Sequence, residues 1–502
     1  MSIRESIQEA RRIIWPIENH ELKKFLPMGF MMFCILFNFT VLRALKDSLV
    51  VPEIGAEALS FLKLWGVLPA AVLAMLLYAE LLSFFSEEKT FYIITGIFIA
   101  FFALFAFVLH PNAELIHPNH EKILAFSKTV PNFKWFILIF GKWSYALFYI
   151  FAELWGSLMV SLLFWQFANK ITTTVEAKRF YTMFGVIGNL ALIAAGELIG
   201  SSGKQAASIA GEVSASSDLN LTFILSIIIV AALFCMFFYY YMNAKVLTDP
   251  RFYSPKVAKK SAKKKLTMKE SFNLIMHSKY LGLIAVIVLC YGISINLVEG
   301  PWKAKIRQLY PTQNEYLQFM GPVFTWIGVG TIISYIIGSN VLRKCSWLTA
   351  ALFTPVMLLL TGLGFFIFSI FNETFNHYAM SIFGTASLVF AVHLGMIQNV
   401  LSKATKYSLF DPTKEMAYIP IDNELKTRGK AAVDVVGGRL GKSGGALIQF
   451  ALFSIFPNAS FETISPYLMV LFALVSVVWM LALVKLNREY LSALDNTEQE
   501  VI

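Results

Sequence analysis

The stretch KAAVDVVGGRLGKSGGALIQ, Lys430–Gln449, predicts a helix that enters a membrane from a basic loop. Arg439 and Lys442 fall about half-way across and, being three residues apart, share one helix face. A cation at that depth costs roughly 2.5 to 3.5 kcal/mol on insertion scales, so it normally faces a partner or a water-filled cavity. Another backbone or a bulky ligand can come close to this helix, because its surface is nearly bare at Gly437, Gly438, Gly441, Gly444 and Gly445.

One interpretation is that Arg439 and Lys442 contact an anion in a transport path. Two other interpretations of this segment compete with it. GRLGKSGG looks like a phosphate-binding P-loop, but the first glycine of that motif is replaced by Val436 and no strand-like run precedes it. The second alternative is structural: the glycines pack against a neighbouring helix, and Arg439 and Lys442 pair with buried acids. We reject the P-loop and keep the structural alternative open.

The composition is that of a polytopic membrane protein. Of the 502 residues 57% are hydrophobic and only 15% are charged, against about 25% in soluble domains, and the mean hydropathy is +0.64. The net charge of +10 falls in short loops rather than in one patch, so it indicates membrane topology and not nucleic-acid binding. The four cysteines lack metal-ligand spacing and predict no disulfide framework. We expect no metal and no cofactor.

About twelve segments are long and apolar enough for a spanning helix, which needs about 20 residues. One long polar linker, 245–279, separates two groups of six, so we expect a cytoplasmic N-terminal segment 1–24, six-helix bundles at 25–244 and 280–486, and a cytoplasmic tail 487–502. The expected spans are 25–50, 58–85, 90–110, 135–168, 179–200, 220–244, 280–302, 315–342, 347–371, 378–402, 430–456 and 462–486.

The distribution of lysine and arginine predicts the orientation. With the termini and the linker on one side, 29 of the 42 basic residues lie there and only seven lie on the other side. This asymmetry places both termini in the cytoplasm. The two halves also resemble each other, because a long fourth helix and a long tenth helix are each followed by a basic loop and a glycine-bearing helix. This is the pattern of major-facilitator transporters, whose substrate site lies near the midplane between the halves.

Several charges fall inside the expected spans. Arg43 and Lys46 share a face of the first helix, with Asp47 beside them, and they either face the interior or snorkel to the headgroups. In the fourth helix a polar stripe runs from Lys142 to Glu153. Glu153 must pair with a buried cation, structurally or functionally, or else bind a proton.

The other half carries a comparable set. Asn296, Glu299 and Lys303 share a face at the end of the seventh helix, where Pro301 is expected to kink or end the helix. In the tenth helix Gln398, Asn399, Lys403 and Lys406 share a face, and we expect the two lysines near the cytoplasm, in contact with water or phospholipid. The cavity charges are mostly positive, which selects a polyanion such as a phosphate-bearing molecule.

The chain resembles the ATP/ADP translocases of obligate intracellular bacteria and plastids. Matching segments run from about residue 13 to residue 490: IIWPIENHELKKFLPM, LRALKDSLVV, AELWGSLMVSLLFWQFAN, EAKRFY, Asn243–Tyr253, INLVEGPWK, SWLTA, QNVLSKATKYSLFDPTKEMAYIPID and GRLGKSGG. The resemblance implies a major-facilitator-like fold and exchange of external ATP for internal ADP, and it leaves open whether phosphate accompanies ADP. It also implies four functionally critical charges: Lys46, Glu153, Glu299 and Lys442.

The hypothesis is therefore an all-α membrane protein that exchanges ATP for ADP by alternating access in the inner membrane of a bacterial cell. It is expected to act as a monomer in the lipid bilayer, to have no enzymatic activity and to bind no nucleic acid. Glu153 and Glu299 are expected to serve gating and coupling, and the candidate base contacts are Tyr149, Asn189 and Asn399. The expected phosphate contacts are Arg43, Lys46, Lys142, Lys303, Arg439 and Lys442.

Alternatives within the same family are a carrier for GTP, CTP, UTP or NAD, and a proton-coupled net importer. A phosphate-transferring enzyme lacks a general-base cluster and a metal-carboxylate pair in this sequence. A channel or receptor with a basic vestibule is the remaining alternative class.

Overall fold

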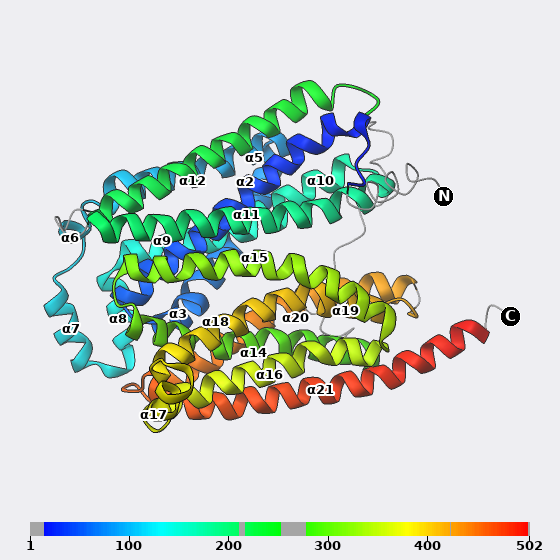
Figure 1. Cartoon of the computed structure of the whole chain (residues 1–502). Coiled ribbons are helices and arrows are strands. Elements are labelled where there is room, and N and C mark those ends of the chain that lie inside the picture. Colours follow the sequence, from blue (N-terminus) through cyan, green and yellow to red (C-terminus); the bar gives the residue numbers. More distant parts are fainter. Residues whose placement is uncertain (1–14, 210–215, 253–277, 422, 500–502) are drawn as a thin grey trace.

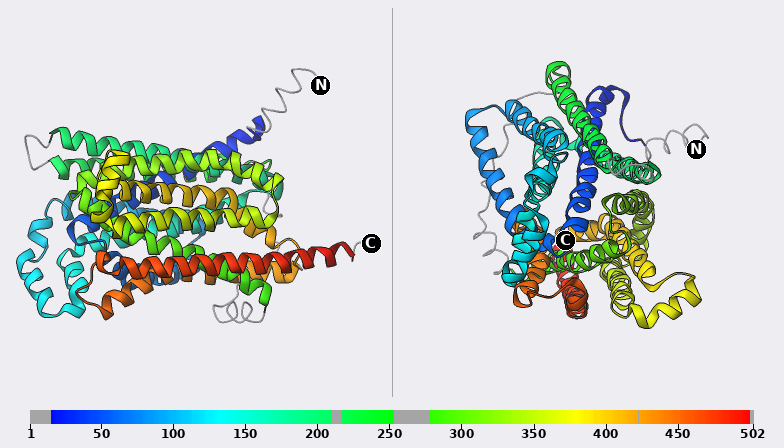
Figure 2. Two further views of the ribbon diagram at one scale, coloured as in Figure 1. Left: turned by 60° about the horizontal axis from the view of Figure 1, so that its bottom comes forward. Right: turned by 90° about the vertical axis from the view of Figure 1, so that its left-hand side faces the viewer.

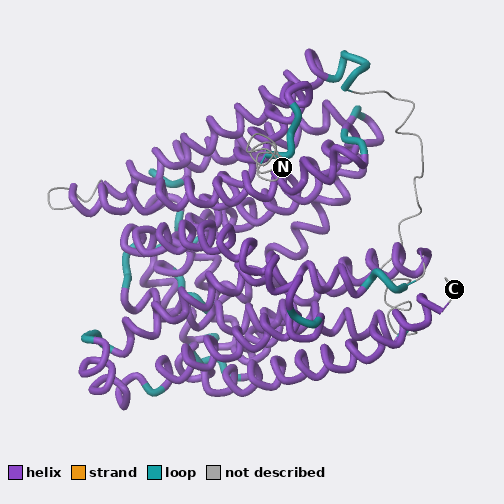
Figure 3. Tube along the Cα trace, turned by 45° about the vertical axis from the view of Figure 1, so that its right-hand side comes forward, coloured by secondary structure: helices purple, strands orange, loops and turns teal. Residues whose placement is uncertain are grey.

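The computed structural model describes residues 15–209, 216–252, 278–421 and 423–499. Within these ranges the chain forms helices joined by short loops and contains no strand (Figure 3). Ten of the described helices are long and apolar enough to cross a membrane, and a bent pair makes an eleventh. The helices lie side by side in one bundle (Figure 1). The structure is thus the all-helical, polytopic architecture that the composition predicts.

Before the linker come spans that, apart from the run beginning with α3, lie in the upper part of the bundle in Figure 1. They are α2 (Leu22–Glu53), the continuous run α3 (Ala58–Phe61), η2 (Leu62–Val67) and α4 (Leu68–Phe84), α5 (Glu87–Leu104) with η3 (Phe105–Leu109), α9 (Trp143–Trp155) with η5 (Gly156–Phe164) and α10 (Trp165–Ile171), α11 (Thr174–Ile209), and α12 (Ser216–Tyr241) with η6 (Met242–Val246). Short helices at the end opposite the termini are α6 (Ala113–Ile116), α7 (His120–Thr129) and α8 (Lys134–Gly141).

The spans after the linker form the lower part of the bundle. They are α14 (Lys279–Leu309), α15 (Gln313–Lys344), α16 (Trp347–Ile370), the pair α17 (Asn372–Phe383) and α18 (Ser387–Thr405), which continues through η7 (Lys406–Phe410) into α19 (Asp411–Ala417), then α20 (Asn423–Ile455) and α21 (Phe461–Gln499). Helix α20 occupies the place of the expected span 430–456, and the apolar segment recognised in its described part is Ser443–Ile455. The expected number of twelve therefore corresponds to ten clear spans, the bent pair and α20.

Three helix boundaries differ from the expectations. The fourth expected helix is interrupted at Lys142, which adopts φ −124° and ψ 44° and separates α8 from α9. The tenth begins only at α18, because α17 ends at Gly384 in the left-handed conformation and the chain turns by 85°. Pro301 neither ends the seventh helix nor interrupts it, because α14 continues to Leu309.

The ends of the chain and the edges of the linker lie at the same end of the bundle. Lys24, near the start of α2, donates a hydrogen bond from Nζ to the carbonyl oxygen of Phe252 at 2.9 Å. Lys279, at the start of α14, forms an ion pair with Glu489 of α21 at 2.6 Å. The described termini are accordingly on one side of the molecule (Figures 1 and 2).

The helices before and after the linker contact each other closely at the opposite end. Helices α11 and α15 meet where a Cβ atom on Gly321 would lie 2.4 Å from the backbone nitrogen of Gly200. Thr325 of α15 donates a hydrogen bond to Glu197 of α11 at 3.1 Å. Nearby helices add a ring contact at 4.9 Å between Phe61 and Phe450. The two groups of helices are thus joined tightly at the end away from the termini.

Candidate substrate-binding site

The charged side chains inside the spans gather at the centre of the bundle. They come from four elements on both sides of the linker: α2, η2, α9 and α14. We call this set the central charge cluster, and its members are Arg43, Lys46, Asp47, Lys63, Glu153, Glu299 and Lys303.

Lys46 links α2 to α9. Its ammonium lies 3.0 Å from Glu153 and 2.9 Å from Asp47, and it sits 3.9 Å from the ring centroid of Tyr149. Lys46 is only 3% exposed, so it does not snorkel to the headgroups. Its three neighbours compensate the cost of burying the ammonium. The predicted pairing of Glu153 with a buried cation is therefore present.

Glu299 and Asp47 link the helices before the linker to α14. The carboxylate of Glu299 lies 2.9 Å from Lys303, 3.4 Å from Lys63 and 3.5 Å from Arg43. Asp47 in turn lies 2.8 Å from Lys303, and both of these side chains are 2% exposed. Three of these ion pairs therefore cross between the helices before the linker and the helices after it.

Two tryptophans hold the helices that carry the carboxylates. The indole nitrogen of Trp155, two residues after Glu153, donates a hydrogen bond to the carbonyl oxygen of Ile35 in α2 at 3.0 Å. The indole of Trp302, three residues after Glu299, donates to the carbonyl oxygen of Val392 in α18 at 2.9 Å. Buried indole nitrogens need such an acceptor, so each bond fixes how one helix faces its neighbour.

A small pocket with room for about one water molecule lies beside the cluster. Both charged side chains and apolar side chains of α15 line it. Together with Lys403, the central charge cluster supplies five cations against three carboxylates, which leaves an excess of positive charge. The lining residues are Arg43, Asp47, Glu299, Trp302, Lys303, Met320, Val323, Phe324, Ile327, Asn399 and Lys403.

The model of the TLC ATP/ADP transporter family matches residues 1–490. The chain belongs to this family. The transporter is similar to ADP,ATP carrier protein 1 of Rickettsia bellii (strain RML369-C), with 52% identity over 494 residues that cover 98% of each chain. It is also similar to ADP,ATP carrier protein 1 of Rickettsia prowazekii (strain Madrid E), with 49% identity and the same coverage. The resemblance inferred from the sequence motifs is thus confirmed.

Solved structures support the fold of the transporter independently. A bacterial homologue of the iron transporter ferroportin in an inward-facing state superimposes with a TM-score of 0.59 at 13% identity, covering 94% of this chain and 99% of the other. The xylose transporter XylE from E. coli in an inward-open conformation gives a TM-score of 0.52 at 11% identity, covering 92% and 94%. Both likenesses confirm the predicted major-facilitator-like fold.

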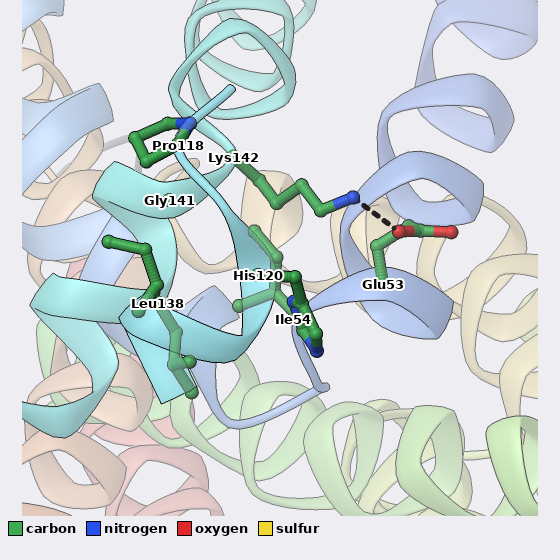
Figure 4. A pocket seen from close by; sticks show the side chains of 8 residues that line it. Glu53, Ile54, Pro118, His120, Leu138, Gly141 and Lys142 are labelled. Atoms are coloured by element: carbon green, nitrogen blue, oxygen red, sulfur yellow. Dashed lines mark hydrogen bonds and ion pairs between the residues drawn. The ribbon is translucent and has the colours of Figure 1, made fainter. Parts of the chain in front are cut away.

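Lys142 lies apart from the central charge cluster of the transporter. The break before α9 places it at the end opposite the termini, where its Nζ lies 2.9 Å from Glu53 (Figure 4). It lines a separate small pocket together with His120. Burial and the nearby Lys142 lower the pKa of His117 to about 4, and its Nε2 lies 2.8 Å from the hydroxyl of Ser144. The structure does not bring Lys142 together with Arg43, Lys46 or Lys303, the other expected phosphate contacts whose side chains it describes.

The candidate base contacts are placed differently from one another. Tyr149 is fully buried, and one face of its ring is taken by Lys46. Asn189 donates a hydrogen bond to Gly185 in its own helix at 2.9 Å and is not among the residues that line the central pocket. Asn399 lines that pocket, and its buried Oδ1 has no partner among the described residues. Only Asn399 therefore remains available as a base contact in this conformation.

The glycine-bearing helix α20 packs tightly against α14. A Cβ atom on Gly292 would lie 2.7 Å from the carbonyl carbon of Gly441, and one on Gly445 would lie 2.4 Å from Cβ of Asn296. These glycines therefore admit a neighbouring helix rather than a ligand, as the structural alternative proposed. The side chains of Arg439 and Lys442 lie outside the described part of the transporter, so their expected roles stay predictions.

Sequence reasoning did not assign three residues that the structure brings to the site. Lys63 was visible as a cation within a span, which is by itself a sign of function. Asp47 stood beside Lys46, but only the fold reveals that it reaches Lys303. Lys403 was expected near the cytoplasm in contact with water or phospholipid, whereas it lines the central pocket.

Proposed function

We propose that this transporter exchanges ATP for ADP by alternating access, and that cations of the central charge cluster bind the nucleotide phosphates. The observation that supports this most strongly is the concentration of ion pairs between the two groups of helices. Arg43, Lys46 and Lys303 are the phosphate contacts that the described geometry favours. Lysine and arginine donors suit phosphate oxygens, and membership in the ATP/ADP transporter family names the matching substrates.

The carboxylates take the place of the substrate in the empty carrier. Glu153, Glu299 and Asp47 satisfy cations that would otherwise be buried without a partner. An entering triphosphate competes for the same ammonium groups and releases the carboxylates. The pocket has room for only about one water molecule, so binding of a nucleotide also requires the helices to move apart around it.

Further features belong to the same proposal. The carrier lies in the inner membrane with both termini in the cytoplasm, acts as a monomer, and admits phosphate together with ADP. The linker 245–279 joins two six-helix bundles at 25–244 and 280–486. The contacts at the end away from the termini then form the closed outer side, and the nucleotide reaches the site from the cytoplasm.

The test is counterflow in proteoliposomes that contain the purified carrier. Uptake of labelled ATP should require internal ADP and should be lost in Lys46→Ala and Lys442→Ala while both variants still insert. Near-normal exchange in both variants would reject the site. Uptake that needs a pH gradient and no internal nucleotide would favour a proton-coupled importer, and competition by GTP, CTP, UTP and NAD would reveal a different base preference.

A further inference from the structure

Lys403 differs from every other cation that lines the central pocket. Arg43 and Lys303 each lie within 3.5 Å of a carboxylate. The side chain of Lys403 has no carboxylate and no hydrogen-bond partner among the described residues, and its ammonium lies 5.9 Å from the ring centroid of Phe324. A ring at that distance compensates only a small part of the cost of taking an ammonium out of water.

A second polar group in the same pocket also lacks a partner. Asn399 precedes Lys403 by one helical turn in α18, so the two share a face. Its Oδ1 atom is buried without a partner among the described residues. Buried polar atoms are almost always hydrogen-bonded, and an exception needs an explanation. The pocket is therefore lined by an ammonium donor and an amide acceptor that both lack a hydrogen-bond partner among the described residues, as expected of a site that binds a polar group.

We infer that Lys403 is a substrate-binding residue that receives a phosphate group of the entering nucleotide before the central charge cluster does. The inference rests on the proposed function. Arg43, Lys46 and Lys303 must first give up a carboxylate, whereas Lys403 has none to give up. The phosphate therefore gains its first charged hydrogen bond at Lys403 without breaking an ion pair. From there it competes for the paired cations across the pocket.

The variants Lys403→Gln, Lys403→Arg and Lys406→Gln test this inference. Lys406 is the matched control, because it follows in the same run of helix, pairs with Asp411 at 2.8 Å and does not line the pocket. Lys403→Gln should raise the KM for labelled ATP by about tenfold or more, as expected for the loss of a charge-assisted hydrogen bond. Lys403→Arg should restore most of the affinity, and Lys406→Gln should leave the KM within about twofold of the wild type.

The Tm in lipid nanodiscs distinguishes a substrate-binding lysine from a merely structural one, because replacing a structural lysine would lower the Tm. Removing an uncompensated ammonium should raise the apparent Tm of the nucleotide-free carrier, and it should reduce the further rise on adding ATP. A lower Tm without nucleotide, or a wild-type KM in Lys403→Gln, would overturn the inference and leave the proposed function intact. Absence of ATP/ADP exchange in the wild type would instead reject the proposed function.

Discussion

The ion pair between Asp47 and Lys303 should be energetically coupled, because it joins the two groups of helices beside the central pocket. Its two charged atoms lie 2.8 Å apart, and both side chains are 2% exposed. Removing one partner of such a pair costs about 3–5 kcal/mol, since the other is left as an uncompensated buried charge. Asp47 also contacts Lys46, and Lys303 also contacts Glu299. We therefore expect Asp47→Asn and Lys303→Met each to lower the free energy of unfolding by about 3 kcal/mol, the lower end of this range.

The double variant should cost less than the sum of the single variants, by about 1–3 kcal/mol, because it removes both charges and leaves the net charge of the cluster unchanged. The assay is denaturant unfolding in lipid nanodiscs, followed by tryptophan fluorescence. The matched control is Lys305 and Glu462, an ion pair at 2.9 Å whose glutamate side chain is 58% exposed. Exposed ion pairs contribute about 0.2–1 kcal/mol, so the double-mutant cycle of Lys305 and Glu462 should show little coupling. Additive effects at Asp47 and Lys303 would refute the reasoning.

Three further predictions concern other parts of the transporter. Glu153→Gln should tighten equilibrium binding of ATP several-fold and slow exchange, because the carboxylate no longer competes for Lys46; weaker binding would contradict the proposed competition. Gly395→Val should lower the yield of folded carrier in size-exclusion chromatography, because a Cβ atom there would lie 2.1 Å from the ring of Trp302, and overpacking costs about 1–3 kcal/mol or more. The pKa of His117 is lowered to about 4 in the folded carrier, against an ordinary value of 6.5. As the pH falls, the unfolded state therefore takes up the proton first. The contribution of His117 to stability is full above pH 6.5 and is lost as the pH falls toward 4. Acidification from pH 7 to pH 5 should therefore lower the Tm of the wild type more than that of His117→Asn, and equal shifts would contradict this.

Much of the fold can be predicted from the sequence because each membrane span is one continuous segment of the chain. A run of apolar residues long enough to cross a bilayer is recognisable without knowing its neighbours. Interruptions of a helix cannot be recognised in this way. Lys142 leaves the helical conformation inside a segment that hydropathy treats as continuous, and the chain turns after α17 at Gly384. Pro301 shows the converse, since α14 continues through this buried proline to Leu309 although proline usually kinks or breaks a helix.

For the site, the sequence could predict which charged residues lie within each helix, but not how residues of different helices meet. The three-residue spacing of Arg43 and Lys46 placed both on one helix face, and Glu153 was expected either to pair with a cation or to bind a proton. Which cation meets which carboxylate depends on how the helices are rotated against each other, and no spacing within one helix contains that information. The pairing of Asp47 with Lys303 and the open position of Lys403 appear only in three dimensions.

The most direct test of the central claim is a structure of the carrier with ATP bound. The account predicts phosphate oxygens within about 3 Å of the ammonium groups of Lys46 and Lys303, and a lengthening of the contact between Lys46 and Glu153, now 3.0 Å. A nucleotide bound elsewhere, with every ion pair of the central charge cluster unchanged, would contradict it.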